Sequence, residues 1–183
     1  GASTGIGAAT ARHAAQAGYT PVLAARSADR IEALAEEVGG LAVTTDVRDW
    51  SANEALIARA LDAYGRGDGV LANAGYGGAR GWLKGTPEEW QDMLATNVLG
   101  AAYTVRAAIP ALTESKGHVL ITSSVAGRFV RLQRIDHTLA TATRSGRSAL
   151  RLRHLRSLKP PRQMRSEWMN GVKRRIQHRS CQS

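Results

Sequence analysis

Three glycines at the start of the sequence have the spacing that lets a polypeptide backbone approach a phosphate group closely. Gly1, Gly5 and Gly7 lie in the segment Gly1-Ala2-Ser3-Thr4-Gly5-Ile6-Gly7, and an alanine-rich stretch without proline follows. Glycine permits a tight turn, and the amino end of the following helix adds exposed N–H groups and the positive end of its dipole. The segment predicts a phosphate or pyrophosphate site, with a glycine-rich helix entry that binds nothing as the alternative.

Further polar elements follow the glycine segment in order along residues 1–127. Each one alone has an ordinary structural explanation, as a turn residue, a cap at the end of a strand, a buried polar group of a helix or a loop hydroxyl. Together with the glycine segment, they form an ordered set along the chain. They are Asp46-Val47, Asn73-Ala74-Gly75, Thr96-Asn97-Val98 and Ser123-Ser124-Val125-Ala126-Gly127.

The residues between these elements alternate between strand-like and helix-like patterns. Apolar runs predict strands at 20–25, 41–45, 69–73 and 117–122. Helices are predicted at 5–17, 31–38, 57–64 and 86–112, the last beginning with an N-cap, a proline and a glutamate in Thr86-Pro87-Glu88-Glu89. Alternating units of this kind predict an α/β fold, in which helices cover both faces of a parallel sheet.

The ordered set resembles the fingerprint of the short-chain dehydrogenase/reductase family over residues 1–127. The resemblance implies a Rossmann-type doubly wound sheet that is incomplete here, because the family's first strand and its C-terminal strands are absent. It implies an oxidoreductase that transfers hydride between a nicotinamide cofactor and a small alcohol or carbonyl compound, with no metal. Ser124 and Asn97 match the family's catalytic positions, and the implied cofactor-binding residues are Gly1, Ser3, Thr4, Gly5, Ile6, Gly7, Arg26, Asp46, Val47, Asn73, Ala74 and Gly75.

Arg26 indicates which nicotinamide cofactor the chain prefers. The strand at 20–25 runs out through Ala24-Ala25-Arg26-Ser27, and Arg26 stands 19 residues past Gly7. A carboxylate in this region selects NAD by binding the ribose 2′-hydroxyl, whereas an arginine accommodates a 2′-phosphate. The absence of an acidic residue at this strand end favours NADP(H) over NAD(H). The alternative is a solvated arginine that caps a loop.

The acid that the family uses for proton transfer is missing. Related enzymes place a Tyr-x-x-x-Lys pair after the serine, but the tyrosines of this chain are at positions 19, 64, 76 and 103, all before Ser124. His137 stands near the expected place without a lysine four residues later, and Lys159 is too far along the chain. The sequence therefore predicts a cofactor-binding domain that lacks its proton donor.

Residues 128–183 differ from the rest of the chain and are predicted to be a basic tail. Residues 1–127 carry 10 basic and 13 acidic side chains, whereas 128–183 carry 15 and 2, so the net charges are −3 and +13. No strand is expected there, and a weak helix from Leu150 to Leu158 would end at Pro160-Pro161. A homo-oligomer that pairs through the long helix is expected for an intact relative.

Two hypotheses explain the tail. One is a frameshift after Arg131, because one choice of codons for Lys-Trp-Ala-Val-Ser-Ala, read one base later, encodes the hexapeptide Ser145-Gly146-Arg147-Ser148-Ala149-Leu150. The other is a genuine tail that binds nucleic acid or an anionic lipid surface. A non-catalytic nucleotide-binding pseudoenzyme is a further alternative for the whole chain. The single cysteine, Cys181, and the lack of a long apolar run predict a cytoplasmic protein without a membrane span.

Overall fold

The computed structural model describes residues 1–77, 84–124 and 149–151. All of them belong to one compact unit, Gly1–Leu152. The division into domains at residue 127 stays a prediction. The helices are α1 (Gly5–Gln16), α2 (Ala28–Val38), α3 (Trp50–Tyr64), α5 (Pro87–Leu94), the π-helical turn η1 (Ala95–Leu99) and α6 (Gly100–Ser115).

The strands are short and form parallel pairs, which confirms the predicted α/β class. β1 (Val22–Ala25) pairs in parallel with β2 (Leu41–Thr44), and α2 connects them. β3 (Gly69–Ala72) pairs in parallel with β4 (His118–Ile121), and the long helical segment α5–η1–α6 lies between them in the chain. Parallel strands need such crossover connections, and they place all their carboxyl ends at one edge.

The two parallel pairs belong to separate sheets, which fits the predicted incomplete sheet. The beginning of the chain lies between their carboxyl ends. The Gly1 nitrogen and the Ala2 N–H donate to the Ala24 carbonyl of β1, at 2.5 and 3.0 Å. The Asn73 side-chain amide, which follows β3, donates to the Gly1 carbonyl at 2.9 Å. Gly1 therefore connects the end of one sheet to the end of the other.

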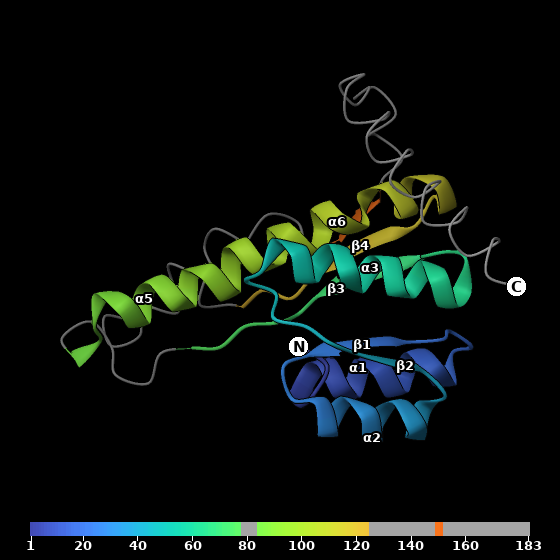
Figure 1. The fold of residues 1–183 in the computed structure, drawn as a ribbon, viewed down its shortest axis with the longest axis horizontal. Helices are drawn as coiled ribbons and strands as arrows, with labels where there is room; N and C mark the ends of the chain where they lie inside the picture. Colours follow the sequence, from blue (N-terminus) through green and yellow to red (C-terminus); the bar gives the residue numbers. More distant parts are fainter. Residues whose placement is uncertain (78–83, 125–148, 152–183) are drawn as a thin grey trace, which may run out of the picture. The chain divides into compact units, whose positions relative to one another are not determined.

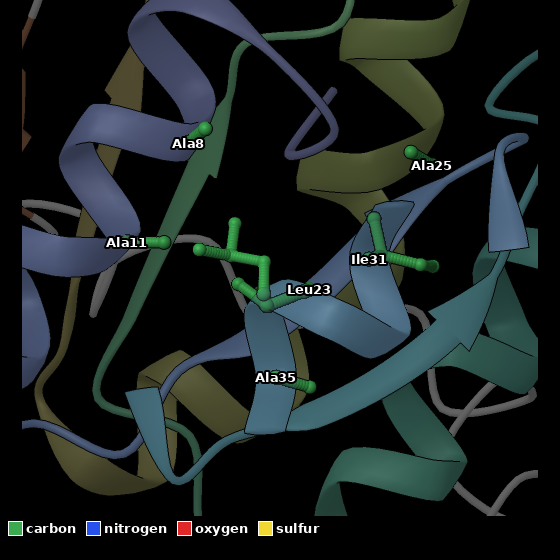
Figure 2. Packing of buried hydrophobic residues seen from close by; sticks show 7 residues of the cluster. Ala8, Ala11, Leu23, Ala25, Ile31 and Ala35 are labelled. Carbon is green, nitrogen blue, oxygen red and sulfur yellow. The ribbon is translucent and has the colours of Figure 1, made fainter. Parts of the chain in front are cut away.

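The first hydrophobic core joins α1 and α2 to β1 (Figure 2). Small side chains of α1 let the helix approach the strand closely, and larger side chains of β1 and α2 fill the remaining space. Ile31 of α2 is completely buried. The buried members of this cluster are Ala8, Ala11, Leu23, Ala25, Ile31, Leu34 and Ala35.

The second core joins α6 to the β3–β4 sheet, and α3 packs against it (Figure 1). Ala108 and Leu112 of α6 and Val119 of β4 are its buried members. Ile57 of α3 and Val70 of β3 pack against this cluster. The two cores hold both sheets in place, and the polar residues of the predicted site lie at the carboxyl ends of the strands.

The predicted long helix from residue 86 to 112 is present as the continuous helical segment α5–η1–α6, and its capping box at Thr86 and Glu89 forms as expected. It differs from the prediction only in the π-helical turn η1. One prediction about secondary structure was wrong: β5 (Ala149–Arg151) pairs antiparallel with β4 where a helix beginning at Leu150 was expected. Three residues carry too little pattern to be recognised, and their conformation depends on the edge that β4 offers.

Candidate cofactor-binding site

A cleft of about 630 Å³ lies at the carboxyl ends of β1 to β4. Open parallel sheets bind their ligands at this edge. All predicted site residues except Gly7 line the cleft. They are Gly1, Ser3, Thr4, Gly5, Ile6, Arg26, Asp46, Val47, Asn73, Ala74, Gly75, Asn97 and Ser124.

Gly7 lies behind the glycine turn and holds it in place. A Cβ atom at Gly7 would stand 2.0 Å from the Gly1 carbonyl oxygen and 2.8 Å from the Asn73 side-chain nitrogen. The contact with the backbone oxygen leaves no room for a side chain, so the turn and α1 can approach each other this closely only with glycine at position 7. Gly5 begins α1 with a φ of 55°, which glycine adopts without strain.

The amino end of α1 is left open toward the cleft. Its N-cap residue, Thr4, makes no side-chain capping bond, and the first turn carries no acidic residue. By contrast, Asp49 caps α3, and Thr86 and Glu89 cap α5 in a reciprocal capping box. Unpaired N–H groups and an uncompensated helix dipole make the start of α1 suited to an anion.

Arg26 supplies a positive charge in the wall of the same cleft. It follows β1 directly, is exposed, and forms no ion pair with any residue that the structure describes. Arg12 and Arg66, in contrast, are paired with Glu37 and Asp68, each at 2.6 Å. An arginine with unused donors at the end of β1 can bind a phosphate through two parallel hydrogen bonds.

Asp46 and Val47 follow β2 and are fixed by a buried amide. Asn53 of α3 is completely buried, and its side-chain nitrogen donates to the carbonyls of Val47 and Asp49 at 2.9 and 2.7 Å. Its side-chain oxygen accepts from the Thr104 hydroxyl of α6 at 2.7 Å. This network holds the loop after β2 in place, because leaving the buried amide of Asn53 without its partners would cost free energy.

The Asp46 carboxylate belongs to a charged network that the sequence analysis did not foresee. Arg48 contacts both oxygens of Asp46 and also pairs with Asp92 of α5. The phenol of Tyr76 donates to Asp92 at 2.5 Å. Hydrogen bonds from Arg48 lower the pKa of Asp46, and those from Tyr76 and Arg48 lower the pKa of Asp92.

Asn97 is buried within η1 and holds the loop that follows β3. Its side-chain oxygen accepts from the Tyr76 N–H at 2.9 Å, and its nitrogen donates to the Tyr76 carbonyl at 2.8 Å. Asn97 is 3% exposed, so the oxygen and the nitrogen of its side-chain amide bind these partners in place of water. Single π-turns often occur at functional positions of helices. Here the turn places Asn97 among the residues that line the cleft.

Asn73 and the residues after β4 complete the wall. The Asn73 side chain donates to Gly1, and its oxygen accepts from the Thr122 hydroxyl at 2.8 Å. Asn73 therefore connects the glycine turn to the end of β4. Ser124 lines the cleft two residues further along. His137 and Lys159 lie outside the described residues, as do Val125 to Gly127.

Tyr76 lines the cleft and was missed as a site residue, because only its place directly after Asn73-Ala74-Gly75 signals it. Partial burial, together with Asp92, raises the pKa of its phenol from 10 to about 12. The neutral phenol therefore stabilises the fold fully below pH 10, and this contribution is lost as the pH rises through 12.

We expect one tyrosine of the chain to ionise near pH 12 in a spectrophotometric titration, and this step to be missing in Tyr76→Phe. In Asp92→Asn the Tyr76 pKa should fall toward 10, because the negative charge that opposes the phenolate is gone. Tyr19→Phe is the control, since it removes an exposed tyrosine that does not line the cleft. A Tyr76 pKa that stays near 12 in Asp92→Asn would contradict the contribution assigned to Asp92 and leave burial as the cause.

Comparison with known proteins identifies the class to which this cleft belongs. The sequence profile of the short chain dehydrogenases matches residues 1–136. The chain belongs to the short-chain dehydrogenase family, as the sequence motifs predicted.

The relatives are longer than this chain. An uncharacterized oxidoreductase of Mycobacterium tuberculosis is 46% identical over 130 residues, which cover 67% of this chain and 47% of that protein. An uncharacterized oxidoreductase of Listeria monocytogenes is 35% identical over 133 residues, covering 69% of this chain and 54% of that protein. The chain thus spans about half the length of the curated relatives that it matches.

Solved structures share the fold. The alcohol dehydrogenase of the archaeon Thermococcus sibiricus, in complex with 5-hydroxy-NADP, superposes with a TM-score of 0.73 at 33% identity. The match covers 78% of this chain and 63% of that chain.

Among the residues that the structure describes, no helix is long and apolar enough to cross a membrane, and no cluster of His, Cys, Asp or Glu could hold a metal ion.

Proposed function

We propose that this chain binds NADP(H) in the cleft and derives from an enzyme that transfers hydride between NADP(H) and a small alcohol or carbonyl compound. One observation carries the proposal: an open helix end, a tight glycine turn and an arginine that forms no salt bridge among the described residues line one cleft in a short-chain dehydrogenase fold. These three features suit the two phosphate-bearing parts of a single dinucleotide.

Each part of the cofactor has a proposed partner in the cleft. The N–H groups at the start of α1, with Gly1, Ser3, Thr4, Gly5 and Ile6, bind the pyrophosphate. Arg26 binds the 2′-phosphate, and the loop of Asp46 and Val47 lies beside the adenine. Asn73, Ala74 and Gly75 border the middle of the cofactor, while Asn97 and Ser124 serve the nicotinamide end. All of these residues line the cleft. Gly7 does not line it but supports the glycine turn from behind.

Arg26 supports NADP(H) over NAD(H). The structural relatives do not decide between the two, because one was solved with 5-hydroxy-NADP and another, from Burkholderia phymatum, with NAD. Arg26 is exposed beside the cleft, and its immediate surroundings in sequence, Ala24, Ala25 and Ser27, carry no acid that would repel a phosphate. A guanidinium binds a phosphate dianion more strongly than it binds a ribose hydroxyl.

We further propose that the 183-residue chain holds the cofactor without appreciable turnover. The bound cofactor supplies the hydride, but a proton must also move to or from the substrate oxygen. Ser124 can orient that oxygen, yet no tyrosine follows Ser124 in the sequence to provide the proton. On this reading the chain is a defective copy of an oxidoreductase. A nucleotide-binding pseudoenzyme is the close alternative.

The test is consumption of NADPH by the full chain in the presence of ketones, aldehydes and quinones. We expect no turnover above that of a Ser124→Ala variant. Turnover that depends on both Ser124 and Asn97 would show that another group supplies the proton and would overturn the proposed inactivity. Such a result would also exclude the pseudoenzyme.

The charge of residues 128–183 favours a second candidate function. A net charge of +13 within this segment suits the binding of nucleic acid or an anionic surface through phosphates. Such binding would weaken steeply with salt and would disappear when residues 131–183 are deleted.

A cytoplasmic location fits the single cysteine at position 181.

A further inference from the structure

The strand β4 lies in the middle of a sheet that two distant segments of the chain complete. It pairs in parallel with β3 on one side and antiparallel with β5 on the other, so the strand order is β3-β4-β5. The antiparallel register places His118 opposite Arg151, Val119 opposite Leu150 and Leu120 opposite Ala149. Within the described part of the chain, β5 is therefore the strand that covers this edge of β4.

The composition of β4 favours pairing with any strand that reaches an open edge. Its sequence, His-Val-Leu-Ile, contains neither a proline nor a side chain with a formal charge at pH 7. β-Branched and other apolar residues favour strand pairing, whereas charges and prolines are what usually prevent it at an edge. Leu120 is also 46% exposed. Without β5, the β4 edge would offer unpaired N–H and C=O groups beside an apolar side chain.

β5 is a poor template for the addition of a further strand. It has only three residues, and arginines stand at positions 147, 151 and 153, within it and on both sides of it in the sequence. Short edge strands and basic side chains both discourage pairing with another chain. The sheet therefore stops growing at β5, whereas an uncovered β4 would let it continue.

A second copy of the chain fits an uncovered β4 edge. Two identical strand edges that exchange equivalent hydrogen bonds around a twofold axis run antiparallel. The pairing with β5 shows that this edge of β4 accepts an antiparallel strand. Two paired β4 edges would form a continuous sheet of order β3-β4-β4-β3, in which the backbone groups that β5 now binds have partners again.

We propose that the β4 edge is a strand-addition surface for a second copy of this chain, and that β5 occupies this surface from within the chain and prevents self-association. The inference concerns a surface other than the cofactor cleft. It does not depend on the binding of any ligand.

The experiment removes the pairing of β5 in the full chain with the double variant Ala149→Pro/Leu150→Pro. Successive N–H groups of a strand point to opposite edges, so two adjacent prolines remove the donor that faces β4. Amide exchange in β4 should become about tenfold or more faster in dilute protein. Sedimentation velocity should show a weight-average mass that rises to about twice the wild-type value between about 1 and 100 µM, as expected for a small interface.

Two further variants identify the surface. Ser157→Pro/Leu158→Pro introduces the same two prolines outside β5 and should match the wild-type chain in exchange and in mass. Adding Leu120→Lys to the first double variant should restore the wild-type mass, because charges at a strand edge oppose its pairing with an identical edge. Leu120 is partly exposed, so the fold tolerates this change.

Four outcomes would overturn the inference. They are unchanged exchange of the β4 amides in Ala149→Pro/Leu150→Pro, faster exchange without a gain in mass, an equal gain in mass in Ser157→Pro/Leu158→Pro, and a gain in mass that persists when Leu120→Lys is added. None of these results bears on the binding of NADPH, which tests the proposed function separately.

Discussion

Replacing Arg26 with glutamate should weaken the binding of NADPH by about 100-fold, while the affinity for NADH stays the same or rises. The substitution removes the charge-assisted hydrogen bonds to the 2′-phosphate and adds repulsion, and one to two such bonds correspond to about 10- to 100-fold. A carboxylate at this strand end can instead accept from the ribose 2′-hydroxyl of NADH. Titration calorimetry with both cofactors measures the change.

Arg30→Glu is the matched control for this prediction. Arg30 is exposed on α2, four residues from Arg26, and does not line the cleft. The same change of charge there should alter NADPH affinity by less than about threefold, because exposed charges at a distance are screened by salt. Equal losses for NADPH and NADH in Arg26→Glu would contradict the role of Arg26 in selecting the phosphate.

Replacing Gly7 with alanine should damage both the fold and the cleft. The new Cβ atom would stand 2.0 Å from the Gly1 carbonyl oxygen, so α1 and the glycine turn must move apart. Overpacking of this kind costs about 3 kcal/mol of unfolding free energy. Displacing the start of α1 from the phosphates should also weaken NADPH binding by about 10- to 100-fold. Thermal unfolding and calorimetry measure the two effects.

Gly67→Ala provides the comparison, because its Cβ atom would meet only the Ala111 side chain at an ordinary contact distance of 3.7 Å. This variant should unfold near the wild-type temperature and bind NADPH equally well. If Gly7→Ala is as stable as Gly67→Ala and binds as tightly, then the close packing between Gly7 and Gly1 does not support the site.

Local features of the sequence were sufficient to predict most of the elements. The capping box of Thr86 and Glu89 was visible in four consecutive residues, and α5 begins there. The strands lie within a few residues of their predicted ranges, because apolar runs bounded by glycine or polar residues mark buried parallel strands. The glycine turn and the polar residues after each strand could be brought together because parallel strands end at one edge.

Features that depend on contacts between distant residues could not be predicted. The turn η1 forms where Asn97 binds the backbone of Tyr76, which lies 21 residues away in sequence. Arg48 reaches Asp92 across 44 residues. β5 requires the free edge of β4, and its three residues have no pattern of their own. In each case tertiary contacts override local propensity, so the network around Asp46 became apparent only from the structure.

The most direct test of the account is a calorimetric titration of the full 183-residue chain with NADPH, followed by an assay for NADPH oxidation in the same sample with carbonyl compounds present. We predict saturable binding of one NADPH per chain without its consumption. No binding at NADPH concentrations up to about 1 mM, which corresponds to roughly −4 kcal/mol, would contradict the assignment of the cleft as a cofactor site.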